Sequence, residues 1–194
     1  KDVWGMSFDI RARILAIKNM LSINSMTEKL TTLFDDLPPV PFLTAKIGAV
    51  VPTLTTFNGN IRQYTFAVND EVFGTGEVTH KYINGGNLMP HIHWATNGVD
   101  TTDRYVKWEM EYSYANTSSA FSTPTIITVE AKIPANTPSL THYRTDLPQI
   151  IGTNITVGDY LCWRVRRITS TGIAPTSNPF GLALGVHVYE SVLK

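Results

Sequence analysis

The sequence predicts a mainly β protein: an antiparallel β-sandwich of the jelly-roll kind, preceded by a short N-terminal helical arm. In the first forty or so residues apolar side chains recur at helical spacing, whereas most segments after Ile61 alternate apolar and polar residues at strand spacing. Turn clusters such as NGG at 84–86 and NG at 97–98 separate these segments. Because no helical pattern lies between the segments, we expect antiparallel rather than parallel pairing.

Length and composition fit one domain with an appendage. A chain of 194 residues can bury a self-sufficient core. We expect a helical attachment arm at 1–44, an extended connector at 45–60 and the jelly-roll domain at 61–194. Only 16% of the residues are charged, against roughly 25% in typical soluble domains. This favours a surface that is partly covered by other subunits.

Two short helices are predicted in the arm. The first carries an apolar stripe with 4-3-4 spacing from Ile10 to Leu21. A capping box, SMTE at 25–28, begins the second, whose apolar face ends at Leu37 before Pro38. Short helices depend on packing, so the arm must bury this surface on its own sandwich or against a neighbouring protein. The residues expected to make these contacts are Phe8, Ile10, Ile14, Ile17, Leu21, Leu30, Leu33 and Phe34.

Strands are predicted at 77–83, 89–96, 105–114, 125–133, 160–169 and 182–193. The segment 105–114 has the strictest pattern, because apolar positions from Val106 to Tyr114 alternate with polar positions from Lys107 to Ser113. One face of each strand should therefore lie in the core. The residues expected in the core or at a subunit interface of the domain are His91, His93, Trp94, Trp108, Tyr112, Trp163 and His187.

Charge and composition disfavour several classes of partner. The formal net charge is zero and no polybasic tract long enough to attract anionic lipid is present, so neither nucleic acid nor an anionic membrane surface is an expected partner. No run approaches the ~18 apolar residues of a membrane span. Cys162 is the single cysteine, and we expect it to be a small buried apolar residue. The chain opens on Lys1 rather than methionine, which favours removal of an upstream piece.

The segment most like an enzyme site contains His91 and His93, which project from one face of a strand at a spacing that can share a metal. Gly85 stands six residues before His91, which resembles the first motif of the cupin metalloproteins. The carboxylate that should follow is replaced by Asn97 and Gly98. We therefore expect structural imidazoles inside the sandwich or at an interface, and no metal or cofactor, with a cupin-like metalloprotein as an alternative.

The basic run RVRR at 164–167 is the other candidate site. Alternation places Arg164 and Arg166 on the polar face of a strand, where a solvated or interface role is expected rather than phosphate binding. The sequence contains no glycine-rich phosphate loop, paired cysteines or serine nucleophile elbow. We predict no catalytic residue and no enzyme activity. Scattered aromatics near the loop 97–103 leave a carbohydrate-binding surface as a further option.

Three segments in order resemble a family of tailed-bacteriophage virion accessory proteins. They are PHIHW at 90–94, VKWEMEY at 106–112 and GVHVYE at 185–190. In that family a PHxHW strand precedes a W-E-x-E-Y strand, and the resemblance covers roughly 61–194. It implies a jelly-roll knob, trimeric, displayed at the surface of the phage particle.

From this resemblance and the patterning we expect a capsid decoration (cement) or head-fibre protein. Its arm would dock on the major capsid protein or another virion protein, and its knob would form a homotrimer. The alternative in the same class is a tail needle or fibre-tip knob that contacts the host surface, including surface glycans. Copy number per particle distinguishes the two, because shell and tail sites differ in symmetry.

Overall fold

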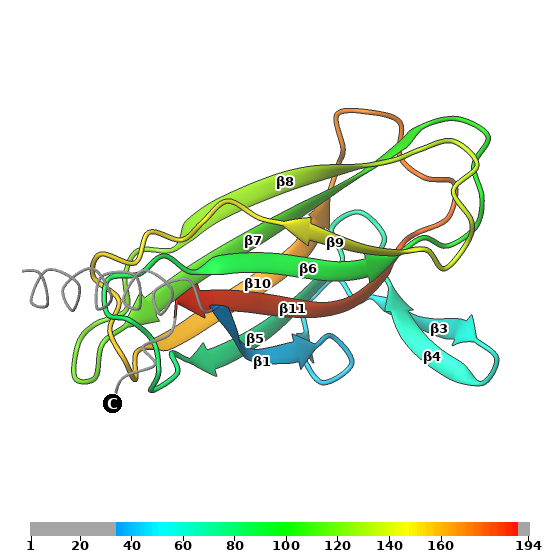
Figure 1. Ribbon diagram of the computed structural model, residues 1–194. Helices are drawn as coiled ribbons and strands as arrows, with labels where there is room; N and C mark the ends of the chain where they lie inside the picture. The colour runs from blue at the N-terminus through cyan, green and yellow to red at the C-terminus, as the bar shows by residue number, and fades with distance from the viewer. Residues whose placement is uncertain (1–33, 190–194) are drawn as a thin grey trace, which may run out of the picture.

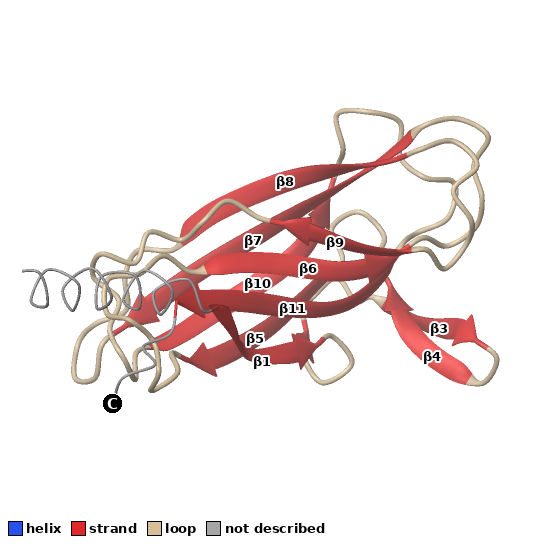
Figure 2. Cartoon of the chain, viewed as in Figure 1, coloured by secondary structure: helices blue, strands red, loops and turns tan. Residues whose placement is uncertain are grey.

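The computed structural model describes residues 34–189, which fold into two layers of antiparallel strands (Figure 1; Figure 2). The first sheet contains β1 (Phe34–Pro41), β3 (Thr53–Asn58), β4 (Ile61–Thr65), β6 (Met89–Ala95), β9 (His142–Asp146) and β11 (Phe180–Tyr189). The second contains β2 (Lys46–Ile47), β5 (Glu71–Glu77), β7 (Arg104–Ala115), β8 (Thr125–Ile133) and β10 (Tyr160–Ile168). Within the described range no helix has the length and apolar character to cross a membrane. The predicted antiparallel β-sandwich is confirmed.

From β4 onward the strand order is that of a jelly roll. The first sheet runs β4-β11-β6-β9 and the second runs β5-β10-β7-β8. Every one of these pairs is antiparallel. Strands that are distant in the sequence therefore become neighbours, and β6 lies between β9 and β11 on the first sheet.

The core lies between the sheets and is lined by the alternating apolar positions. Val106, Trp108 and Met110 of β7 are fully buried, as are Ile92 and Trp94 of β6. These side chains face one another across the two layers. Burial of such a face, at about 25 cal/mol per Å² of apolar surface, is the main stabilising contribution to the sandwich.

Four predicted strands, at 89–96, 105–114, 125–133 and 160–169, match β6, β7, β8 and β10 within two residues. The strand predicted at 77–83 is wrong, because β5 ends at Glu77 and a turn-rich loop follows it. The strands β4, β5 and β9 had not been predicted. Cys162, expected to be buried, is half-buried on the outer face of β10.

The second predicted helix is wrong where it enters the described range. Residues 34–41 form β1, which pairs with the edge of β11 in the register Phe34 to Tyr189. Pairing with β1 gives the backbone groups at the edge of β11 hydrogen-bonding partners. The same pairing buries Leu37 in the core. Pro38 falls where the register shifts, a position that needs no ladder donor. The first predicted helix, and the arm contacts from Phe8 to Leu33, lie outside the described residues.

The predicted connector 45–60 is also wrong in part, because it contains two strands. β2 belongs to the second sheet and β3 to the first. Strand β3 pairs with β4 as a two-stranded hairpin that projects from the sandwich (Figure 1). We call residues 53–65 the projecting hairpin. Its turn places Gly59 at a φ of +56°, which glycine adopts without the steric cost of a Cβ.

Candidate functional site

Four histidines form a row on the outer face of the first sheet. Strand β6 directs Ile92 and Trp94 into the core, so His91 and His93 project from the opposite face. Ring centroids are separated by 4.3 Å for His187 and His91, 5.0 Å for His91 and His93, and 5.1 Å for His93 and His142. The histidine row (His187, His91, His93, His142) therefore crosses three neighbouring strands, β11, β6 and β9.

His91 is buried although it lies on an outer face. Only 3% of its surface is exposed. Gly185 is its partner on β11, and a Cβ at that glycine would lie 2.3 Å from Nε2 of His91, so the imidazole packs directly over bare backbone. Burial, together with the nearby His187 and Arg144, lowers the pKa of His91 to about 4. His91 is therefore neutral at pH 7.

His93 and His142 are linked directly. Nδ1 of His93 lies 2.9 Å from Nε2 of His142, and the two rings are nearly parallel, at 13°. Because one nitrogen must donate a proton and the other must accept it, at least one of the two rings is neutral. His93 is half-buried and His142 is exposed.

A hollow of about 430 Å³ lies beside the histidine row. It is lined by Met89, Arg144, Asp146, Leu147, Gln149 and His187. Arg144 Nε donates to Asp146 Oδ1 at 2.8 Å, so the two charges at its rim offset each other. The hollow is therefore lined by apolar side chains, including Met89 and Leu147, and by an arginine–aspartate pair whose charges offset each other.

The structure changes the interpretation of the histidines in two respects. Of the two places expected for His91 and His93, the inside of the sandwich is wrong, because both project from its outer face, whereas a subunit interface stays a prediction. Their rings meet edge to face, at 80°, and within residues 34–189 no three His, Cys, Asp or Glu side chains are grouped to hold a metal ion. Sequence reasoning also missed that His142 and His187 join them. For His187 the signal was present, since it alternates with the buried Val186 and Val188.

Stability should fall in acid through His91. The unfolded histidine has a pKa near 6.5 and the folded one about 4, so the unfolded chain binds more protons between these values. The stability is fully present above pH 6.5 and decreases as the pH falls, by up to about 3 kcal/mol near pH 4. Urea unfolding in chelator-containing buffer at pH 7.5, 6 and 5 should show this decrease. A His91→Gln variant should lose about that much of the pH dependence, and an unchanged slope in the variant would contradict the assignment.

The outer face of the second sheet carries a network of five charged side chains. Arg164 Nη2 lies 2.8 Å from Glu111 Oε2 and 3.1 Å from Glu109 Oε1, and Arg164 Nη1 lies 3.4 Å from Glu71 Oε2. Arg166 Nη2 lies 2.8 Å from Glu109 Oε1. Alternation had placed both arginines on this face. Because three carboxylates surround two guanidinium groups, the network has no excess positive charge with which to bind phosphate.

Arg167, the third arginine of the run, points the other way and was not singled out from the sequence. It is 3% exposed, and its Nη1 donates to the Phe66 carbonyl at 2.7 Å and to Asn178 Oδ1 at 2.8 Å. Asp70, 4% exposed, accepts from the Ala67 amide at 2.6 Å. Burial raises the pKa of Asp70, while the Ala67 amide and the charge of Arg167 act in the opposite direction. These buried polar groups hold the loops after β4 and before β11 together.

No family model matches the chain, and no curated protein matches it in sequence. Solved structures that resemble it include a Paenibacillus sp. cycloisomaltooligosaccharide glucanotransferase complexed with cycloisomaltoheptaose, at 12% identity and a TM-score of 0.40, over 80% of this chain and 18% of that one. TmCBM61 in complex with β-1,4-galactotriose matches at 9% identity and a TM-score of 0.32, over 82% and 90%. The structure of infectious bursal disease virus Gx strain matches at 9% and 0.32, over 76% and 39%. These weak similarities assign no function.

Proposed function

We propose that the chain is a bacteriophage virion structural protein, a capsid decoration or head-fibre protein. Its sandwich forms a trimeric knob, and the segment before β1 docks on the shell. The observation that supports assembly most directly is the apolar surface of the projecting hairpin. The ordered set of motifs at 90–94, 106–112 and 185–190 supports the phage context.

The projecting hairpin has the properties of a contact surface. Ile61 is 59% exposed and Leu54 is 41% exposed. They lie on opposite faces of the hairpin, because Leu54 is paired with Tyr64, three residues after Ile61. Val50 and Val51, which precede β3, are 45% and 49% exposed. Several exposed large apolar residues on one projecting element favour a site of protein association. A second copy of this chain is the partner we propose, because the zero net charge and low charged fraction favour self-association.

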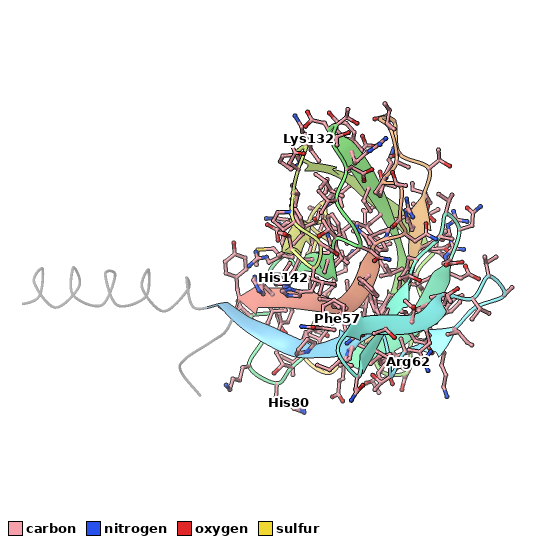
Figure 3. All side chains as sticks on the ribbon, turned by 90° about the vertical axis from the view of Figure 1, so that its right-hand side faces the viewer. Phe57, Arg62, His80, Lys132 and His142 are labelled. Carbon is pink, nitrogen blue, oxygen red and sulfur yellow. The ribbon has the colours of Figure 1, made fainter. Side chains whose placement is uncertain are left out.

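The hairpin is also held in a fixed position. Phe57 packs edge-on against the buried Phe180 of β11, with ring centroids 4.9 Å apart. Arg62 Nη2 donates to the Leu54 carbonyl at 2.9 Å, across the two strands. Phe57 and Arg62 are both labelled on this side of the molecule in Figure 3. A preordered surface loses less conformational entropy on association, which favours a stable oligomer.

The first test measures the mass of the full chain in solution by light scattering during size-exclusion chromatography. We expect three times the mass of one chain. Ile61→Ser should dissociate the trimer, because it places a hydroxyl in the buried contact. Ile151→Ser is the matched control, since Ile151 is 64% exposed and lies in the loop between β9 and β10, away from the hairpin. A monomeric wild type, or an Ile61→Ser trimer, would exclude this interface.

The second test removes the segment that we propose to dock. The deletion ends at residue 33, because Phe34 begins a strand of the first sheet. We expect the shortened protein to keep the melting temperature of the full chain and to form a trimer of correspondingly lower mass, but not to join particles. Incorporation at the normal level would contradict docking by this segment. Hundreds of copies per particle would support shell decoration, whereas about three to eighteen would support the tail alternative.

A further inference from the structure

We propose a transition-metal site between His93 of β6 and His142 of β9, on the outer face of the first sheet. The two ring nitrogens, Nδ1 of His93 and Nε2 of His142, already converge to 2.9 Å. Imidazole nitrogen is a preferred ligand of Zn²⁺, Cu²⁺ and Ni²⁺. The site supplies two protein ligands and leaves the remaining coordination positions to water.

The strand register explains why these two rings meet. His93 is opposite Arg144 and His142 is opposite Ala95, so the histidines are diagonal neighbours on adjacent strands. Long side chains at diagonal positions can reach each other across a sheet. Ala95 has a small side chain, which leaves space above β6 for the ring of His142.

The observed geometry is close to that of two ligands on one ion. A Zn–N bond of ~2.0–2.1 Å in a tetrahedral site separates two ligand nitrogens by about 3.3 Å. The pair at 2.9 Å therefore needs to open by a few tenths of an ångström when a metal takes the place of the hydrogen bond. The ring that donates must then carry its proton on its other nitrogen, so that both facing nitrogens are free to bind the metal. Because His142 is exposed, it can make this movement without disturbing the core, and water can reach the ion.

The other two histidines are less suited to be ligands. His91 presents Nε2 to the backbone of β11, where a Cβ at Gly185 would lie 2.3 Å away, so this nitrogen is directed toward the sheet. His187 packs against His91 rather than against the proposed pair, with ring centroids 4.3 Å apart. His91 instead contacts the ring of His93 edge to face and helps to orient it.

The test titrates the full chain with zinc chloride alone, by isothermal titration calorimetry at pH 7.5. We expect one zinc ion per chain. His142→Gln and His93→Gln should each weaken binding about tenfold or more, since even outer-shell partners of a metal ligand are worth 10–100-fold. His80→Gln is the control, because His80 is exposed, contacts Glu77 at 3.8 Å and lies apart from His142 in Figure 3. It should bind zinc like the wild type.

Thermal unfolding gives a second readout. Zinc should raise the melting temperature of the wild type with increasing concentration, because it binds only the folded arrangement, and should not raise that of His142→Gln. Circular dichroism without zinc checks that each variant is folded, which we expect for the exposed His142. Absence of binding to the wild type would overturn the proposal. Unchanged binding in His142→Gln with loss in His91→Gln would assign the ion to the pair on β6 and also overturn it.

Discussion

Replacing Trp94 with alanine is expected to lower the free energy of unfolding by about 3–5 kcal/mol, the usual cost of truncating a large buried aromatic side chain. Trp94 is fully buried, and its ring stacks on Tyr143 with centroids 4.6 Å apart. Its Nε1 also donates to Thr145 Oγ1 at 2.8 Å. The substitution opens a cavity in the centre of the core and leaves the threonine hydroxyl without this donor. Urea unfolding at pH 7.5 measures the loss.

Two further variants separate the contributions of Trp94. Trp94→Phe keeps most of the ring but removes the donor to Thr145, and we expect a smaller loss of about 1–3 kcal/mol. Phe121→Ala removes an aromatic ring that is 52% exposed and should change stability by about 0.5 kcal/mol or less. If Trp94→Ala cost no more than Phe121→Ala, the placement of Trp94 between the sheets would be wrong.

Replacing Arg167 with methionine should have a comparably large effect, about 3–5 kcal/mol. Arg167 is 3% exposed, and its guanidinium satisfies the Phe66 carbonyl and the Asn178 amide oxygen. Methionine fills much of the volume but donates no hydrogen bond, so both acceptors lose their partner. The buried carboxyl of Asp70 also loses the nearby positive charge that offsets its burial.

Arg166 provides the matched control, because it is the preceding residue on the same strand but lies on the outer face, where its side chain is 29% exposed. Its contact with Glu109 belongs to the charged network on the outer face, so Arg166→Met should cost about 1 kcal/mol or less. Equal losses for the two variants, measured by urea unfolding, would contradict the assignment of opposite faces. Adding Asp70→Asn to Arg167→Met should recover part of the loss, because it removes an uncompensated buried charge.

The strands that could be predicted are those whose inward residues are large. β7 and β10 place tryptophan and valine on one side and, apart from the inward Arg167, charged residues on the other, so their pattern is visible without knowledge of the fold. β5 could not be found in this way, because two of its positions are Gly74 and Gly76. A Cβ at Gly74 would lie 2.1 Å from the ring of Trp163, so the glycine is required by a residue nearly ninety positions away.

The start of the sandwich was misjudged for a related reason. The spacing of Leu30, Leu33, Phe34 and Leu37 fits a helix, but Phe34 and Leu37 belong to β1 in the structure. Local pattern is a weak guide where an unpaired sheet edge can recruit the segment, since tertiary pairing overrides propensity. Pairing with β11 makes this segment a strand rather than a helix, and the place of β11 beside it depends on the strand order of the whole sheet.

The histidine row was partly predictable. The spacing of His91 and His93 shows that they share a face, because strand side chains alternate with period two. Their contacts with His142 and His187 depend on strand order, which places β9 and β11 on either side of β6. No spacing within one segment reports on neighbours that are forty-nine positions apart, as His93 and His142 are.

The pairing of β1 with β11 distinguishes the two ends of the sandwich. Phe34 pairs with Tyr189, so the first and last described residues lie at one end of the sandwich, whereas the turn between β3 and β4 lies at the opposite end (Figure 1). A binding partner at the end of the sandwich that contains Phe34 would thus leave the exposed Leu54 and Ile61 of the hairpin uncovered. A label placed at the end of the sandwich that holds the β1–β11 pairing would leave the hairpin accessible to a probe.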